Sequence, residues 1–212
     1  RVTTVFLLSP AYCGGRRATM LVRPGATHQM ALRLQAGTLS LGEAFAFMSG
    51  LYFRGKLAYA KAFARKESDV LVITPTRGLQ PPDGIITRAL IEEFATTDVA
   101  DDEPRYRDPL LADARRLAGG LPLDATVVLL GSVATTKYVD VLRDVFGDSL
   151  CFPADFVGRG DMSRGALMLR SATAGTKLKY LAVSSEPARH GPRPPRLTKA
   201  TASAAIPLQA GS

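Results

Sequence analysis

The sequence predicts an α/β layered fold in which a mostly parallel central sheet is flanked by helices. Three apolar runs carry this prediction, at residues 2–8, 69–75 and 125–131. None of them alternates with polar residues, which is typical of strands that are buried on both faces. Segments with helical periodicity separate the runs, and this alternation of strands and helices indicates helices on the faces of a parallel sheet.

The first half of the chain is divided into elements by glycine and proline. The sequence "SPAYCGG" ends the first strand, and "RPGATHQMALRLQAG" predicts a turn followed by a helix. Gly50 and Gly55 loosen the junction between two helical pieces, and "TRGLQPPDGIIT" predicts irregular chain after the second strand. An acidic connector is expected before Pro109. The other helices are expected at residues 16–22, 41–65 in two pieces, 88–95, and 109–118, which Gly119 and Gly120 end.

The second half continues the same alternation. The segment "SVATTKYVDVLRDVFG" predicts a helix with Ser132 as its N-cap and Gly147 just past its end. A short fourth strand is expected in "SLCFPADF", and another helix in "DMSRGALMLRSA". The alternating segment "KLKYLAVS" predicts an edge strand.

The chain length suits one domain, which we expect at residues 1–185. Residues 186–212 are rich in proline, alanine and basic residues, so we expect a flexible basic tail there. No apolar run approaches the ~20 residues that span a bilayer, and no signal peptide is evident. We therefore expect a cytoplasmic protein without a membrane partner.

Composition excludes several classes of site. The only cysteines, Cys13 and Cys151, have no metal-binding spacing, and we expect both to be buried thiols. The only histidines are His28 and His190, which argues against a histidine-based catalytic triad or a structural zinc site. We expect no metal and no cofactor. The formal net charge of +8 favours a polyanionic partner, although an ordinary arginine-rich surface would give the same charge.

Cations follow the carboxyl ends of the predicted strands, where ligands bind in sheets of this kind. The segments "CGGRR", "TPTRG", "GSVATTK" and "GRGDMSRG" combine small residues with lysine or arginine. Free N–H groups at a helix start can hold a phosphate or carboxylate, as can hydroxyl groups beside them. The alternative for "GSVATTK" is a simple capped helix. The candidate phosphate or nucleotide ligands are Arg16, Arg17, Arg77, Ser132, Thr135, Lys137, Tyr138, Arg159 and Arg164.

Carboxylates near the same strand ends are candidate acids or bases. Asp83 and Asp161 are the candidate catalytic residues, because glycosidic bond chemistry uses carboxylates as acids, bases or charge stabilisers. Asp161 has two other interpretations. It is either the N-cap of the helix that follows or the ion-pair partner of Arg159 and Arg164.

Five segments, in order, resemble the YaaA family of bacterial peroxide-stress proteins and smaller bacterial domains related to it. These segments are "LLSPA", "LYFRGKLAYAKAF", "VITPTRGLQPPD", "VVLLGSVATTKYVDVL" and "GRGDMSRGALM". The last segment is the most specific match, to the Ala-Arg-Gly-x-Met-Ser-Arg motif of the family. Tyr12 stands where the family's opening motif has lysine. The resemblance implies a Rossmann-like core, a basic cleft, DNA binding and a link to oxidative stress.

Three functions remain open from the sequence. The first is a nucleic-acid or nucleotide-binding protein that binds DNA, RNA, a nucleotide or another phosphorylated small molecule in a basic cleft. The second is an enzyme that cleaves or forms the N-glycosidic bond of a nucleotide or nucleoside in the same cleft. The third is an interaction module whose cations are ordinary surface residues.

Overall fold

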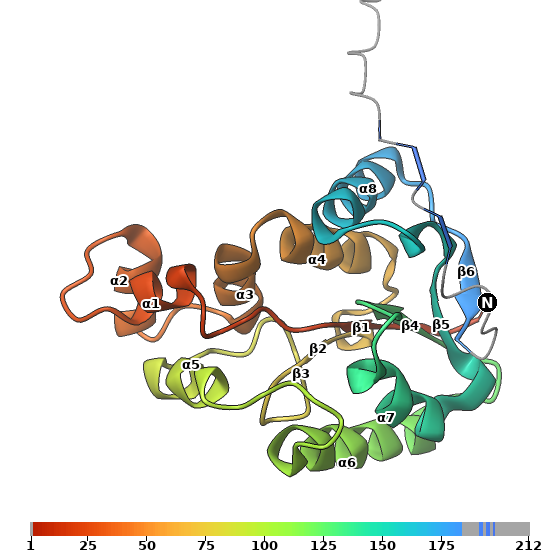
Figure 1. The fold of residues 1–212 in the computed structure, drawn as a ribbon, viewed down its shortest axis with the longest axis horizontal. Helices are drawn as coiled ribbons and strands as arrows, with labels where there is room; N and C mark the ends of the chain where they lie inside the picture. Colours follow the sequence, from red (N-terminus) through yellow and green to blue (C-terminus); the bar gives the residue numbers. More distant parts are fainter. Residues whose placement is uncertain (1, 184–190, 193, 196, 198–212) are drawn as a thin grey trace, which may run out of the picture.

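The computed structural model describes residues 2–183, 191–192, 194–195 and 197, and within them one six-stranded sheet forms the centre of the molecule (Figure 1). The strand order is β3-β2-β1-β4-β5-β6. The four central strands β2, β1, β4 and β5 run parallel to one another. The edge strands β3 and β6 pair antiparallel with β2 and β5. The strands are β1 (Thr4–Leu8), β2 (Val70–Ile73), β3 (Leu79–Gln80), β4 (Thr126–Leu130), β5 (Leu150–Pro153) and β6 (Tyr180–Ala182). The predicted α/β layered fold is confirmed.

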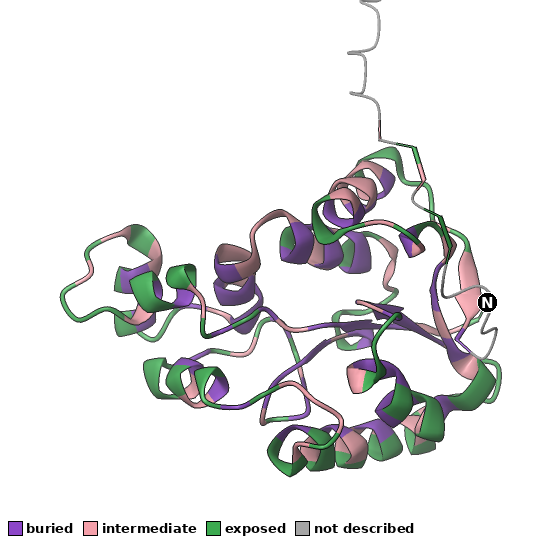
Figure 2. Cartoon of the chain, in the orientation of Figure 1, coloured by how far each residue is buried: buried purple, intermediate pink, exposed green. Residues whose placement is uncertain are grey.

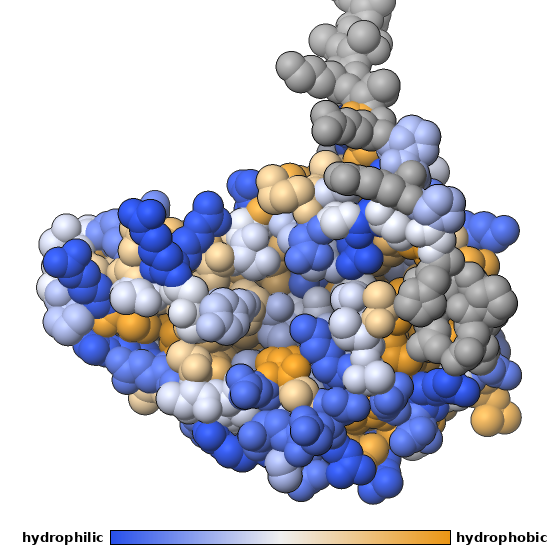
Figure 3. Space-filling model, in the orientation of Figure 1, coloured by the Kyte–Doolittle hydropathy of each residue, from blue (hydrophilic) through white to orange (hydrophobic). Residues whose placement is uncertain are grey.

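Helices cover both faces of this sheet. Helices α3, α4 and α8 lie over one face and α6 and α7 over the other, while α1 and α2 lie beyond the carboxyl end of β1 (Figure 1). The outer sides of α6 and α7 are largely hydrophilic (Figure 3). The helices are α1 (Arg16–Val22), α2 (Gln29–Gln35), α3 (Leu41–Ser49), α4 (Leu51–Phe63), α5 (Arg88–Ala95), α6 (Pro104–Gly120), α7 (Thr136–Phe146) and α8 (Asp161–Ala174).

The sheet separates two hydrophobic cores, and β1 contributes to both. Phe6 and Leu8 pack with the helices of the α3–α4–α8 face, whereas Val5 and Leu7 pack with α6 and α7. All four side chains are buried because helices cover both faces, which explains four apolar residues in succession. Figure 2 shows that buried residues gather on the sheet and on the sides of the helices that face it, whereas the outer sides of the helices are mostly exposed. The inference from the continuous apolar run to a doubly covered strand is therefore confirmed.

Several element boundaries differ from the sequence predictions. Helix α6 begins at Pro104 instead of Pro109, so residues 104–108 of the expected acidic connector are helical. Pro104 occupies the first turn, where a missing N–H costs nothing, and burial of Tyr106 and Leu110 compensates for Pro109 inside the helix. The two glycines at 119 and 120 continue the helix rather than end it.

The segment "TRGLQPPDGIIT" also contains regular structure that the sequence prediction excluded. Gly78 has a φ of +59°, which lets the chain turn back so that β3 pairs antiparallel with β2. The hydroxyl of Thr74 donates to the Gly78 carbonyl at 2.9 Å, and the N–H of Leu79 donates to Asp113 Oδ2 at 2.9 Å. These bonds fix a tight turn where irregular chain was expected.

Helices α4 and α8 cross at a contact between two glycines. A Cβ atom on Gly55 would lie 2.5 Å from the Gly165 carbonyl oxygen, and one on Gly165 would lie 2.6 Å from that of Leu51. Only glycine allows backbones to approach this closely. Gly55 is therefore helical and serves close packing, and the prediction that it loosens the chain is wrong.

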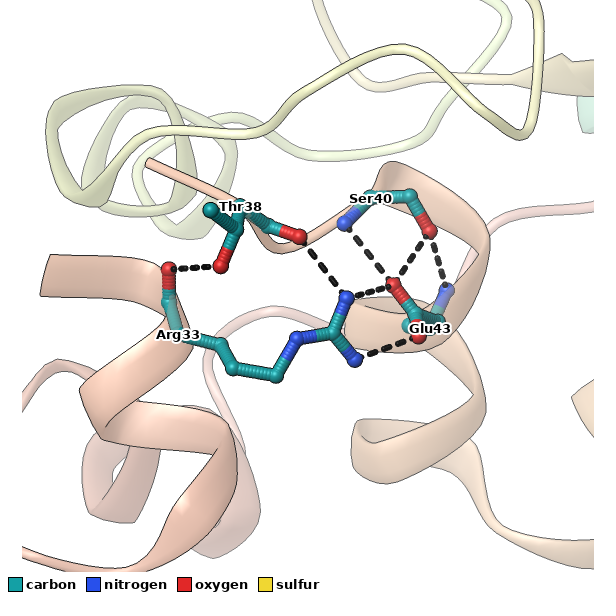
Figure 4. Close-up of polar contacts among 4 residues, drawn as sticks. All are labelled: Arg33, Thr38, Ser40 and Glu43. Carbon is teal, nitrogen blue, oxygen red and sulfur yellow. Dashed lines mark hydrogen bonds and ion pairs between the residues drawn. The ribbon is translucent and has the colours of Figure 1, made fainter. Parts of the chain in front are cut away.

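A polar network closes the start of α3 (Figure 4). The Ser40 hydroxyl accepts a hydrogen bond from the Glu43 N–H, and the Ser40 N–H donates to the Glu43 carboxylate in return. Arg33 donates to the same carboxylate and to the carbonyl of Thr38. Hydrogen bonds from the Arg33 guanidinium lower the pKa of Glu43 to about 2, so this network joins α2 to α3 through a permanently charged pair.

The remaining sequence predictions concern the thiols, the edges and the tail. Cys13 and Cys151 are free thiols, Cys13 buried and Cys151 half-buried, and burial raises the pKa of both. Strand β6 is the expected edge strand. Most of the tail predicted at 186–212 lies outside the described residues. Among the described residues, no helix combines the length and apolar character that crossing a bilayer requires.

Candidate functional site

The topology of the sheet creates a crevice at the carboxyl ends of β1 and β4. Strands β1 and β4 are neighbours in the sheet, but the chain continues from β1 to β2 on one side and from β4 to β5 on the other. The loops that follow β1 and β4 therefore diverge. Ligands bind at such switch points in open α/β sheets. A cleft of about 290 Å³ lies here, and we call it the β1/β4 cleft. Its polar lining residues are Ser9, Tyr12, Ser49, Tyr52, Ser132, Lys137, Tyr138 and Asp161.

A close contact between the strand ends forms the floor of the cleft. The Ser9 N–H donates to the carbonyl of Leu130 at 3.1 Å, which extends the β1–β4 pairing by one residue. A Cβ atom on Gly131 would lie 2.8 Å from Ser9 Cβ, so glycine is needed for this approach. Ser9 and the "GS" of the "GSVATTK" segment are therefore neighbours, as the sequence analysis expected of the strand ends.

Lys56 on α4 lies beneath the floor and is fully buried. Its Nζ donates to the Ser9 carbonyl at 2.7 Å and to the Ser9 hydroxyl at 2.8 Å. The ammonium group also lies 4.2 Å from the ring centroid of Tyr52 and 5.0 Å from that of Phe53. A fully buried lysine without a carboxylate in hydrogen-bonding contact is rare, which marks this position as a functional candidate.

Burial lowers the pKa of Lys56 to about 7. The nearby Asp161 carboxylate opposes this effect, whereas the positive charges of Arg164 and Lys137 add to it. Four ionisable groups from three helices thus share one electrostatic environment, with three cations against one carboxylate. Because its pKa lies near 7, Lys56 exchanges its proton at neutral pH.

Tyr52 lines the cleft, and its buried hydroxyl has no hydrogen-bond partner among the described residues. The residue is only 8% exposed, and burial raises its pKa to about 12. The Ser9 hydroxyl lies close enough to lower the pKa of both Tyr52 and Tyr138. Since an unpaired buried hydroxyl is unfavourable, Tyr52 is prepared to donate a hydrogen bond to a ligand.

The loop that follows β4 forms the second wall. Helix α7 begins at Thr136 with Thr135 as its N-cap, so the prediction that Ser132 caps this helix is wrong. Five residues, 131–135, separate the strand from the helix, and this loop leaves Ser132 half-buried in the cleft. Lys137 in the first turn of α7 also lines the cleft, with its Nζ 5.1 Å from the ring centroid of Tyr138. Thr135 is exposed and does not line it.

Helix α8 forms the third wall through Asp161, while Arg164 of the same helix does not line the cleft. Gly160 is the N-cap residue, so the expectation that Asp161 caps the helix is wrong. Asp161 instead forms an ion pair with Arg164 at 3.7 Å and remains exposed to the cleft. Arg164 is buried and donates from Nε and Nη2 to the carbonyl of Phe156 at 3.2 and 3.1 Å. Two of the three guanidinium nitrogens of Arg164 are therefore occupied by a backbone carbonyl.

The other predicted site residues lie away from the cleft. Arg77 forms an ion pair with Glu93 at 2.7 Å, and both residues line a second surface hollow. Asp83 forms an ion pair with Lys61 at 3.4 Å, and both line a third one. The remaining three are arginines of the "CGGRR" and "GRGDMSRG" segments. Arg16 is exposed on α1, Arg17 donates to the Phe47 carbonyl, and Arg159 donates to the Asp155 carbonyl and the Ser163 hydroxyl.

Sequence reasoning missed Ser9, Tyr52 and Lys56. A signal was present, because Tyr52, Lys56 and Tyr59 recur at helical spacing on one apolar face of α4. A lysine inside an apolar stripe departs from the pattern of a solvated face and indicates a buried charge.

No group of three histidine, cysteine or carboxylate side chains in the described part of the chain is arranged to hold a metal ion. Comparison with family models, curated proteins and solved structures gave no match.

Proposed function

We propose that the β1/β4 cleft binds the phosphate group of a nucleotide, either free or within a nucleic acid. The observation that carries this proposal is the buried Tyr52 hydroxyl, which has no partner among the described residues and belongs to a residue that lines the same cleft as Lys137. Tyr52 lacks a hydrogen-bond acceptor and Lys137 makes no ion pair with a described residue, so an anion satisfies both.

The geometry suggests where each part of a nucleotide lies. The phosphate fits between Ser132, Lys137 and the start of α7, where N–H groups and the helix dipole favour negative charge. The Tyr12 side chain is 79% exposed at the edge of the cleft, which suits stacking on a base. The volume of about 290 Å³ is at the lower end for ligand sites, so one nucleotide unit is the natural occupant.

The resemblance to the YaaA family supports the same proposal. Two of the segments that carry it, "VVLLGSVATTKYVDVL" and "GRGDMSRGALM", supply two walls of the cleft. The resemblance also carries our proposals that the protein works in the cytoplasm and has a role in oxidative stress or DNA protection.

A second candidate function is the processing of an N-glycosidic bond in the same cleft. It is favoured by Asp161, whose carboxylate is exposed to the cleft and could stabilise positive charge that develops on a sugar. Asp83 lies beside a separate hollow, so Asp161 would have to act without it.

The experiment that tests nucleotide binding is calorimetric titration with adenosine monophosphate and a short single-stranded oligonucleotide at low salt. Lys137→Gln is expected to weaken binding about 10-fold or more, because a charge-assisted hydrogen bond contributes about 1.5–3 kcal/mol. Arg143→Gln removes the same charge from the same helix outside the cleft, so it is the matched control. Equal loss of affinity in both variants, or no heat with either ligand, would overturn the proposal.

A further inference from the structure

We propose that Ser9 and Lys56 form a serine–lysine pair that attacks a small acyl ester in the β1/β4 cleft, with Ser9 as the nucleophile and Lys56 as its general base. The two reactive atoms, Ser9 Oγ and Lys56 Nζ, lie 2.8 Å apart, and Ser9 lines the cleft. This activity goes beyond nucleotide binding and does not depend on it, because neither residue is needed to hold the phosphate.

The surroundings of Lys56 suit a base that must lose its proton near neutral pH. The ammonium group is fully buried, and no carboxylate in the part of the chain that the structure describes forms a hydrogen bond with it. One N–H is fixed by the Ser9 carbonyl at 2.7 Å, so the lone pair of the neutral amine is left for the Ser9 hydroxyl. The ionisable groups that face Lys56 are Tyr52 on its own helix, Lys137 and Tyr138 on α7, and Asp161 and Arg164 on α8. The positive charges of Lys137 and Arg164 favour the neutral form of the Lys56 amine, whereas the Asp161 carboxylate favours the charged form.

Two tyrosine hydroxyls are available to stabilise the oxyanion that forms during attack. The Tyr52 hydroxyl is buried, lacks a partner in the described part of the chain and lies near Ser9. The Tyr138 hydroxyl also lies near Ser9, from the opposite wall. Hydroxyl groups that are already in position can donate hydrogen bonds to an oxyanion. The nucleophile, the base and the oxyanion donors of this proposal therefore lie around the Ser9 side chain.

The reaction balances with water as the only other reactant. Ser9 Oγ forms a bond to the carbonyl carbon while its proton passes to Lys56 Nζ. The bond from that carbon to the leaving alkoxide breaks, and the alkoxide takes the proton from the Lys56 ammonium group. Lys56 then removes a proton from a water molecule while the water oxygen forms a bond to the carbonyl carbon of the acyl-serine. The bond from that carbon to Ser9 Oγ breaks, the Lys56 ammonium group returns the proton to Ser9 Oγ, and the carboxylic acid is released. Since Ser9 is only 3% exposed, only short acyl groups can reach it.

The experiment incubates the full chain with 4-nitrophenyl acetate, stops the reaction with acid and maps the acetylated residue by peptide mass spectrometry. We expect acetylation of Ser9, with a rate of nitrophenolate release that rises with pH through about 7 and then levels off. Acetylation only on exposed lysines, on Lys56 itself or nowhere would overturn the proposal.

Variants separate the nucleophile from the base. Ser9→Ala should abolish the adduct, and Lys56→Met should slow its formation about 100-fold or more while preserving side-chain volume. Ser149→Ala and Lys61→Met are matched controls, because both residues lie outside the cleft and should leave the rate unchanged. Should Lys56→Met fail to fold, the site of acetylation and the pH profile of the wild type still decide. A Ser9 adduct that forms equally fast in folded Lys56→Met would show that Lys56 is not the base.

Discussion

Lys56 and Arg164 are both buried cations at the same cleft, and their hydrogen-bond partners give them different chemistry. Arg164 donates twice to the carbonyl of Phe156 and keeps Asp161 as an ion-pair partner. A guanidinium cannot lose its proton in a protein, so Arg164 acts as a fixed charge that holds the chain before α8. Lys56 has the Ser9 carbonyl and hydroxyl as its hydrogen-bond partners, so its charge depends on pH.

The lowered pKa of Lys56 predicts a pH dependence of stability. The folded protein releases this proton near pH 7, whereas the unfolded chain releases it near 10.5. The contribution of Lys56 to the free energy of unfolding therefore increases as the pH rises from about 7 toward 10.5. We expect Lys56→Met to remove this increase when urea unfolding is measured between pH 7 and 9.5, which stays below tyrosine ionisation.

The control for this measurement is Lys61→Met, because Lys61 is an exposed lysine on the same helix. It should keep the pH slope of the wild type. The account of Lys56 would be wrong if Lys56→Met and the wild type showed the same slope.

At the scale of elements, glycine decides which helix reaches the cleft. The Gly55–Gly165 contact lets the start of α8 lie over α4, which brings Asp161 and Arg164 into the electrostatic environment of Lys56. The sequence predicted both helices but not their crossing. A crossing depends on contact between residues 110 positions apart, and the periodicity of either helix does not contain that information.

Gly165→Ala is expected to destabilise the fold by about 2 kcal/mol, because the added methyl group would overlap the backbone of α4. Gly119→Ala is the matched helical control, since its Cβ atom would meet nothing within 4 Å. It should be neutral or stabilise by about 0.5 kcal/mol, as alanine favours helix. Chemical denaturation of both variants measures the difference, and equal stabilities would contradict the close crossing.

Other elements show where local patterns were sufficient. Helices α1 and α5 begin and end at the predicted residues. Gly14 and Gly15 precede α1 and Pro24 follows it closely, and Thr87 is the N-cap of α5. Strand β3 was missed because two residues carry no periodicity, and the hydrogen bonds that fix its turn come partly from α6. The start of α7 was placed too early because the "GSVA" loop contains Ser132, a good N-cap residue, and Ala134, a good helix former.

For the whole molecule, the sequence predicted the fold class and a cleft at the carboxyl ends of the strands, but not which segments share it. The end of β1, the loop after β4 and the start of α8 meet there, whereas Gly78 turns the segment after β2 away toward α5 and α6. Strand order decides this outcome, and strand order is a property of long-range pairing. The buried pair of Ser9 and Lys56 depends on it as well.

The β1/β4 cleft as the ligand site is the central claim, and two-dimensional NMR of the labelled protein titrated with adenosine monophosphate tests it most directly. We expect saturable shifts of the amide signals of Ser9, Tyr12, Ser132 and Lys137, while those around Arg77 and the Asp83–Lys61 pair stay in place. Shifts confined to those other hollows, or no shifts at millimolar nucleotide and low salt, would contradict the claim.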